Sequence, residues 1–121
     1  MGLVGLNKTN YSKQQVSIRQ NIIATEKEFF DMNANAALAQ KQNEMDKLNR
    51  LIDKDKELIA LRTSIKETAS SQLSGGIITT TDYLSKLNAE SLSKLNHKVR
   101  VMELELAKID YLMILGKEVT D

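Results

Sequence analysis

The side chains with the most obvious capacity for chemistry are one histidine, His97, and three acidic residues spaced two apart. Asp53, Asp55 and Glu57 would point to different sides of a helix, because residues two apart do not share a helical face. His97 lies in a polar stretch, and the sequence holds no cysteine and no second histidine to join it. We therefore interpret the three carboxylates as solvated and His97 as a surface residue, and we expect no enzymatic activity and no metal site.

Nucleotide and nucleic-acid binding have equally little support in the sequence. The pair Gly75-Gly76 lacks the Gly-Lys-Ser/Thr ending of a phosphate-binding loop. Seventeen basic and sixteen acidic residues are interleaved, leave a net charge of +1, and have no aromatic platform beside them. We expect no cofactor and no nucleic-acid partner. The absence of cysteine excludes disulfides but does not fix the cellular compartment.

The glycine pair instead predicts a turn between two helices. Gly75 or Gly76 can take the left-handed conformation that ends a helix. Thr79 is a good N-cap, and Asp82 three residues later completes a capping box in which each residue bonds the backbone N–H of the other. Ile78 before the cap and Tyr83 after it would form a hydrophobic staple.

The elements around this turn are predicted to be long helices. The 121 residues include no proline, and aromatic residues are only 4% of the chain, which favours helices over a sheet. We predict a lead-in over residues 1–11, a helix over 12–74, the turn over 75–79, a helix over 80–115 that Gly116 ends, and a tail over 117–121. No apolar run approaches the roughly 20 residues of a membrane-spanning helix. The fold class is all-α, a long antiparallel two-helix coiled-coil hairpin.

Both helices carry apolar residues at heptad spacing, which is typical of supercoiled helix packing. The first has two such rows, which are Leu38, Met45, Ile52 and Ile59, and Leu48, Leu51, Leu58, Ile65 and Ala69. Asp55 and Arg62 interrupt them. The second has one regular row, predicted to be its packing interface, which consists of Asn88, Leu92, Leu95, Val99, Met102, Leu106, Ile109 and Met113. A two-helix hairpin cannot bury apolar rows on several sides, so we expect self-association or a place in a larger helical barrel or bundle.

Residues 72–84, together with a later pattern in the second helix, resemble a known family. Gly76, Thr79, Asp82 and Leu84 match a Gly-x-x-Thr-x-x-Asp-hydrophobic-Leu turn between two long helices. Ala107, Tyr111 and Leu112 match an Ala-x-x-x-Tyr-Leu pattern near the end of the second helix. These features resemble the C-terminal periplasmic helical hairpin of TolC-like outer-membrane efflux proteins, and the resemblance covers about residues 12–116.

The resemblance implies a function and a location. Such proteins are homotrimers whose helices build a periplasmic α-barrel, a passive conduit that meets a periplasmic adaptor, or membrane fusion protein, at its helix turns. An inner-membrane pump supplies the energy indirectly. By this analogy the adaptor-contact tip consists of Gly75, Gly76, Ile77, Ile78 and Thr79, and Asp82 lies at the pore entrance, where acidic rings favour cations. The chain would be the periplasmic part of an outer-membrane protein.

Two departures from the family pattern limit what the resemblance implies. Many members carry a second acidic residue one turn after the first, where this chain has Ser85. Members also contain two helical repeats and membrane strands, so we expect this chain to be a fragment. The alternative interpretations are a coiled-coil hairpin from a periplasmic adaptor, which would have β-rich flanks, and a structural coiled-coil interaction module.

Overall fold

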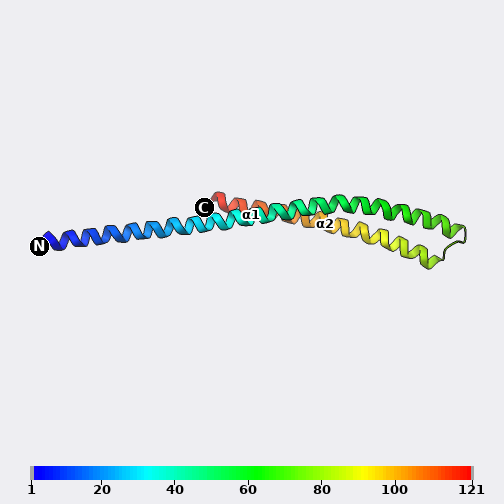
Figure 1. The fold of residues 1–121 in the computed structure, drawn as a ribbon, viewed down its shortest axis with the longest axis horizontal. Helices are drawn as coiled ribbons and strands as arrows, with labels where there is room; N and C mark the ends of the chain where they lie inside the picture. The colour runs from blue at the N-terminus through cyan, green and yellow to red at the C-terminus, as the bar shows by residue number, and fades with distance from the viewer. Residues whose placement is uncertain (1, 121) are drawn as a thin grey trace. The chain divides into compact units, whose positions relative to one another are not determined.

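The computed structural model describes the backbone of residues 2–120 and the side chains of residues 7–117, and it is built from two helices. Helix α1 spans Gly2–Ser74 and helix α2 spans Thr80–Thr120, with no strand among the described residues (Figure 1). The predicted all-α helical hairpin is therefore confirmed, and so are the end of the first helix at Ser74 and the start of the second at Thr80.

The outer ends of the helices differ from the prediction. Helix α1 begins at Gly2 and not at residue 12, and α2 continues through Gly116 to Thr120. A glycine lowers helix propensity by about 1 kcal/mol relative to alanine, but it ends a helix only where its backbone turns left-handed. Among the described residues only Gly76 has a positive φ, so Gly116 is not the predicted C-cap. Met1 and Asp121, in the predicted lead-in and tail, lie outside the described residues.

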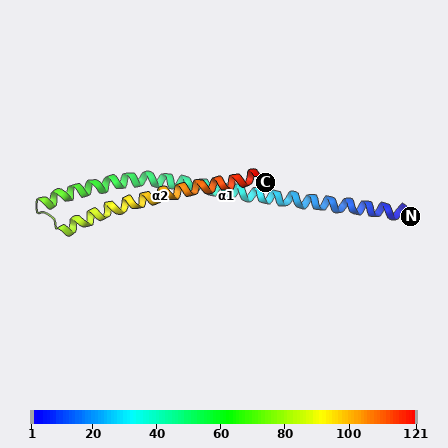
Figure 2. The ribbon, with the colours of Figure 1, turned by 180° about the vertical axis from the view of Figure 1, so that it is seen from behind.

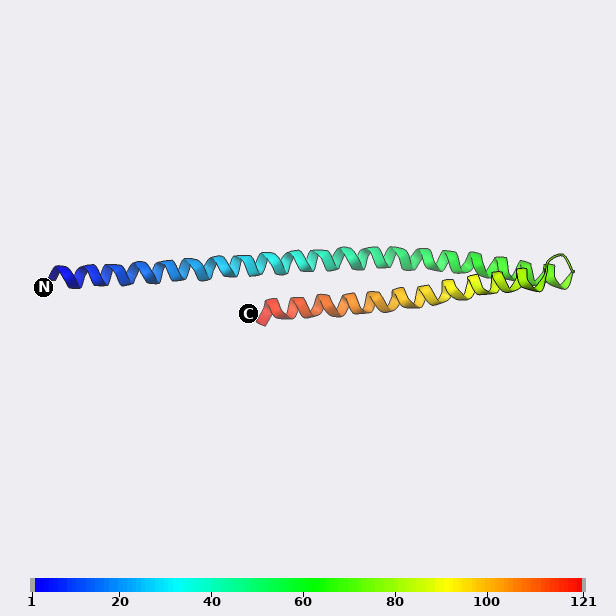
Figure 3. The ribbon, with the colours of Figure 1, turned by 90° about the horizontal axis from the view of Figure 1, so that it is seen from below.

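The chain divides into two units, Gln40–Met113 and Met1–Ala39 with Ile114–Asp121. In the first unit, the α1 segment and the α2 segment run antiparallel and lie side by side on either side of the turn. Figures 1 and 2 show this pairing from opposite sides, and Figure 3 shows it from below. The hairpin that carries the candidate site is this unit.

The buried core of the hairpin is small and lies away from the turn. Leu48 and Ile52 of α1 pack with Leu104 and Ala107 of α2, and Met45 covers the cluster. Nine of the α1 residues that are at least partly buried recur in alternating steps of four and three, the spacing that keeps one helical face against a partner. They are Lys41, Met45, Leu48, Ile52, Asp55, Ile59, Arg62, Lys66 and Ala69. This face combines Met45, Ile52 and Ile59 of the first predicted α1 row with Leu48 and Ala69 of the second.

The predicted interface row of α2 is wrong. The α2 residues that turn toward α1 are mostly polar or small and include Glu90, Ser93, His97, Arg100, Leu104 and Ala107. The regular apolar row is instead exposed, and we call it the outer row of α2; it consists of Leu92, Leu95, Val99, Met102, Leu106, Ile109 and Met113. The row's periodicity correctly marked one face of the helix, but α1 packs against a different face.

The second unit carries exposed apolar side chains on α1. Phe29 is 58% exposed, and Ile18 and Ile22 are exposed on the same side. With Thr25 these residues line one shallow groove, as expected for positions spaced four, three and four apart. Leu38, from a predicted α1 row, is partly buried within this unit.

Candidate functional site

The tip of the hairpin begins with a fully hydrogen-bonded helix end. Gly76 has φ of 72° and takes the left-handed conformation. Its N–H donates to the Leu73 carbonyl at 3.0 Å, and the N–H of Ile77 donates to the Gln72 carbonyl at 2.8 Å. These two bonds form a Schellman motif, which satisfies carbonyls that a helix end otherwise leaves unpaired. The prediction of a glycine stop is confirmed, and Gly76 is the residue that makes it.

The next helix begins with the predicted capping box, which is also confirmed. The Thr79 N–H donates to Asp82 Oδ2 at 3.2 Å, and the Asp82 N–H donates to Thr79 Oγ1 at 3.1 Å. The Tyr83 N–H donates to the Thr79 carbonyl at 3.1 Å and starts the helical ladder. The backbone and side-chain hydrogen bonds from Thr79 hold the pKa of the Asp82 carboxyl below its ordinary value, and Lys86 acts in the same direction.

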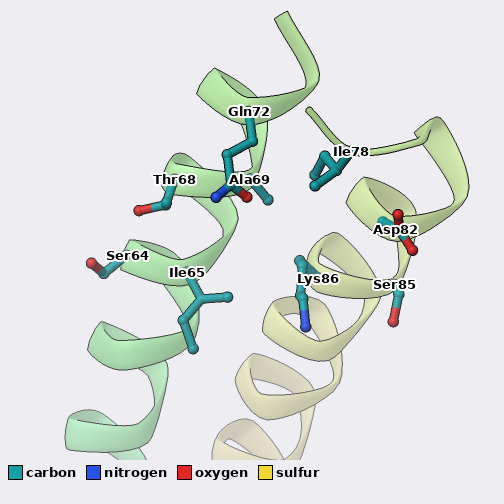
Figure 4. A pocket seen from close by; sticks show the side chains of 9 residues that line it. All are labelled: Ser64, Ile65, Thr68, Ala69, Gln72, Ile78, Asp82, Ser85 and Lys86. Atoms are coloured by element: carbon teal, nitrogen blue, oxygen red, sulfur yellow. The ribbon is translucent and has the colours of Figure 1, made fainter. Parts of the chain in front are cut away.

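The two isoleucines between the caps have different environments. Ile77 is 75% exposed, the highest value among the exposed large apolar side chains of the described chain. Ile78 is partly buried and lines a groove of about 430 Å³ with Ile65 and Ala69 of α1. Figure 4 shows Ile78 between the two helix ends, with Asp82 and Lys86 on the α2 side. Ile78 thus helps to close the hairpin, whereas Ile77 is presented outward.

The tip residues predicted from the sequence are therefore brought together in one short segment. Gly75, Gly76, Ile77 and Thr79 are exposed. Asp82 lines the groove, and its Oδ2 accepts the hydrogen bond from the Thr79 N–H. Ile78 and Tyr83 are both partly buried, as the predicted staple requires. The arrangement offers a compact apolar and hydroxyl-bearing surface that suits contact with another protein and holds no nucleophile–base pair.

A buried carboxylate, that of Glu90, lies between the apolar core and the turn. Its burial was not predicted from the sequence. Glu90 is only 4% exposed. Its Oε2 lies 3.2 Å from Lys66 Nζ across the interface, and its Oε1 lies 3.5 Å from Lys94 Nζ. A hydrogen bond from the Thr63 side chain is the largest cause that lowers the pKa of Glu90, and Lys66 and Lys94 add to it against the opposing effect of burial. None of these contacts with α1 was predicted from the sequence.

Asp55 forms a second charged contact and corrects the interpretation of the acidic run. Asp55 is buried, and its Oδ2 lies 2.8 Å from Arg100 Nε and 3.9 Å from His97 Nδ1. Asp53 and Glu57 are exposed, as predicted. His97 is partly buried against α1 and is not a surface residue. The heptad position of Asp55, three after Ile52 and four before Ile59, was the sequence signal that placed it on the inner face.

The described residues contain no group of acidic, histidine or cysteine side chains that could hold a metal ion. Within the same residues, no helix is both long and apolar enough to span a membrane. Comparisons with protein-family models, with curated proteins and with solved structures found no match for this chain.

Gly76→Ala is expected to destabilise the tip, whereas Gly75→Ala is not. A side chain at Gly76 would be forced into a left-handed backbone conformation, which costs about 1–2 kcal/mol. A Cβ on Gly75 would meet its nearest neighbour, the Ser71 carbonyl oxygen, at 3.6 Å, which is ordinary contact. Urea unfolding of both variants measures the difference in the free energy of unfolding. Equal losses in the two variants would contradict the assignment of the helix stop to Gly76.

The capping box is expected to weaken in acid. The pKa of Asp82 is lower in the folded hairpin than its ordinary value of 3.8, so the folded state binds fewer protons than the unfolded chain in this range. The stabilisation is therefore complete above about pH 4 to 5 and is lost as the pH falls through the folded pKa. An NMR titration should show the Thr79 amide and the Asp82 carboxyl shifting together below pH 3.8, with Asp82→Asn abolishing the Thr79 response. An Asp82 carboxyl whose pKa is not below the ordinary value of 3.8 would rule out the bonded carboxylate.

Proposed function

We propose that this chain is a periplasmic α-barrel segment of a trimeric outer-membrane efflux or secretion channel, whose tip docks a periplasmic adaptor of a tripartite pump. The observation that carries the proposal is the tip itself. The resemblance to TolC-like proteins rests on the Gly-x-x-Thr-x-x-Asp turn, and Gly76, Thr79 and Asp82 form a rigid, internally bonded turn that leaves Ile77 exposed. A pre-organised turn loses little conformational entropy on binding, which suits a docking surface.

The faces of the hairpin support a role in a wall built from several helices. The outer row of α2 is apolar and exposed, and a wall of helices side by side would cover such a face. The chain would then be a passive conduit in the periplasmic part of an outer-membrane protein. The inner-membrane pump would act on it only through the adaptor, and the parent protein would be a homotrimer.

Asp82 suits the proposed place at the pore entrance through its charge. Its lowered pKa keeps the carboxylate ionised at neutral pH, and only its Oδ2 is used by the Thr79 N–H. Symmetry-related copies of one carboxylate around a narrow opening would attract cations. Ser85 one turn later adds no second charge, so the proposed ring contains a single acidic residue from each such turn.

The second candidate is a coiled-coil interaction module, either the hairpin of a periplasmic adaptor or a structural coiled coil. The exposed outer row of α2 favours it, because an apolar heptad row is the surface through which coiled coils associate. This candidate uses the faces of the helices and needs no role for the tip.

Ile77→Asp separates the two candidates in an outer-membrane protein that carries this hairpin. The substitution changes an exposed tip side chain without touching the core, so the trimer should form while adaptor binding and drug efflux fall at least tenfold. Leu61→Asp is the matched control, because Leu61 is also exposed but lies on α1 away from the tip. Adaptor cross-linking and drug sensitivity provide the measurements. Unchanged efflux with Ile77→Asp would overturn the docking role of the tip.

A further inference from the structure

The outer row of α2 is a long apolar surface with no partner among the described residues. Its seven side chains are between 45% and 65% exposed, and they belong to the segment of α2 that is coloured yellow to orange in Figure 1. They follow steps of three and four without interruption, so that they form one continuous stripe on a supercoiled helix. Isolated exposed apolar residues need no explanation, but a stripe of seven indicates a binding surface.

Helix α1 of the same hairpin cannot cover this stripe. With the outer row at heptad positions a and d, the residues that face α1 take positions b and f, and they are Glu90, Ser93, His97, Arg100, Leu104 and Ala107. The two faces are about 150° apart around a helix of 3.5 residues per turn. The interface with α1 is held by the ion pairs of Asp55 and Glu90, so rotating α2 to bury the outer row would break both.

We propose that the outer row binds the outer row of a second copy of this chain, with the two α2 helices antiparallel. In the favoured register Val99 lies opposite Met102 of the second copy, and Leu95 lies opposite Leu106. Leu92 then lies opposite Ile109, so that six of the seven apolar positions pair with one another. The interface is two-fold symmetric, and each contact occurs twice.

The charges beside the row select this register. In an antiparallel coiled coil, g positions face g positions, and here they place Lys98 beside Glu105 of the second copy on both sides of the axis. Lys98 and Glu105 are exposed. Glu105 uses only its Oε1 for the neighbouring Lys108, 3.2 Å away in the same helix, which leaves Oε2 accessible.

The other arrangements bring like charges together. Sliding the antiparallel pair by one heptad in one direction puts Glu105 beside Glu105 of the second copy, and sliding it in the other direction puts Lys98 beside Lys98. A parallel pair joins g to e positions, so Lys98 would still meet Glu103, but Glu105 would meet Asp110. A like-charged pair across an interface is destabilising, and of these arrangements only the favoured register contains none.

This inference does not rest on the proposed channel function, because it concerns the chain alone. In a three-fold wall of equally oriented hairpins the antiparallel neighbour of α2 would be an α1 helix, so the outer row would not meet its own copy there. The pairing proposed here is that of the chain on its own.

Sedimentation equilibrium of the full chain tests the surface. The unmodified chain is expected to be a dimer at about 100 μM, and Leu95→Glu should weaken its association on the order of a hundredfold, because the symmetric interface loses two apolar contacts and gains two charges. Leu61→Glu is the control, since Leu61 on α1 has nearly the same exposed fraction, 58% against 57%. Circular dichroism verifies that both variants stay helical. A monomeric or trimeric unmodified chain, or an equal loss in the control, would overturn the proposal.

Charge exchange tests the register. Lys98→Glu alone should weaken the dimer on the order of tenfold, because it replaces two attractive contacts by two repulsive ones. Adding Glu105→Lys should restore association, whereas adding Glu103→Lys should not. Rescue by Glu103→Lys and not by Glu105→Lys would mean a parallel pair, and no effect from any charge change would also contradict the assigned register.

Discussion

The short connection over residues 75–79 determines which face of α2 meets α1, and the rest of the hairpin depends on it. Gly76 closes the end of α1, and the Thr79–Asp82 capping box begins α2 at a fixed residue, so neither helix can lengthen or rotate freely at the turn. Once this register is set, the b and f positions of α2 face inward. The polar and small residues of α2 are therefore buried, and its apolar row is left exposed.

The charged contacts at the interface add little to the free energy of unfolding, but they strongly favour this pairing of the two helices over a slipped one. Asp55 with Arg100, and Glu90 with Lys66, exchange hydration for an ion pair, which gives little net gain in stability. A buried carboxylate without its partner is costly, however, so a slip of one heptad that separated both pairs would be strongly disfavoured. The compact apolar cluster of Leu48, Ile52, Leu104 and Ala107 supplies the hydrophobic part of the interface. We infer that the hairpin has a small apolar core, and that its buried ion pairs fix which residues of the two helices lie opposite one another.

Much of this fold was predictable because local signals determine it. A glycine stop, a capping box and the absence of proline act within a few residues, and they correctly predicted Ser74 and Thr80 as helix ends. The face of α2 was not predictable in the same way, because an apolar heptad row shows that a face prefers burial without showing which helix buries it. Asp55 and His97 were misinterpreted for a related reason. Their polarity suggested solvent, whereas Asp55 lies three residues after Ile52 and His97 lies seven residues before Leu104, and both positions are at the interface.

Cysteine cross-linking gives the most direct test that the outer row of α2 pairs with itself in an antiparallel register. The chain has no cysteine, so Leu95→Cys and Leu106→Cys can be made in separate chains, mixed and oxidised. We expect a disulfide mainly between position 95 of one chain and position 106 of the other. Leu95→Cys should cross-link much less with Met113→Cys, because position 113 lies one heptad beyond position 106. Disulfides only between identical variants would mean parallel helices, and no cross-link at all would contradict the assignment of the outer row as an interface.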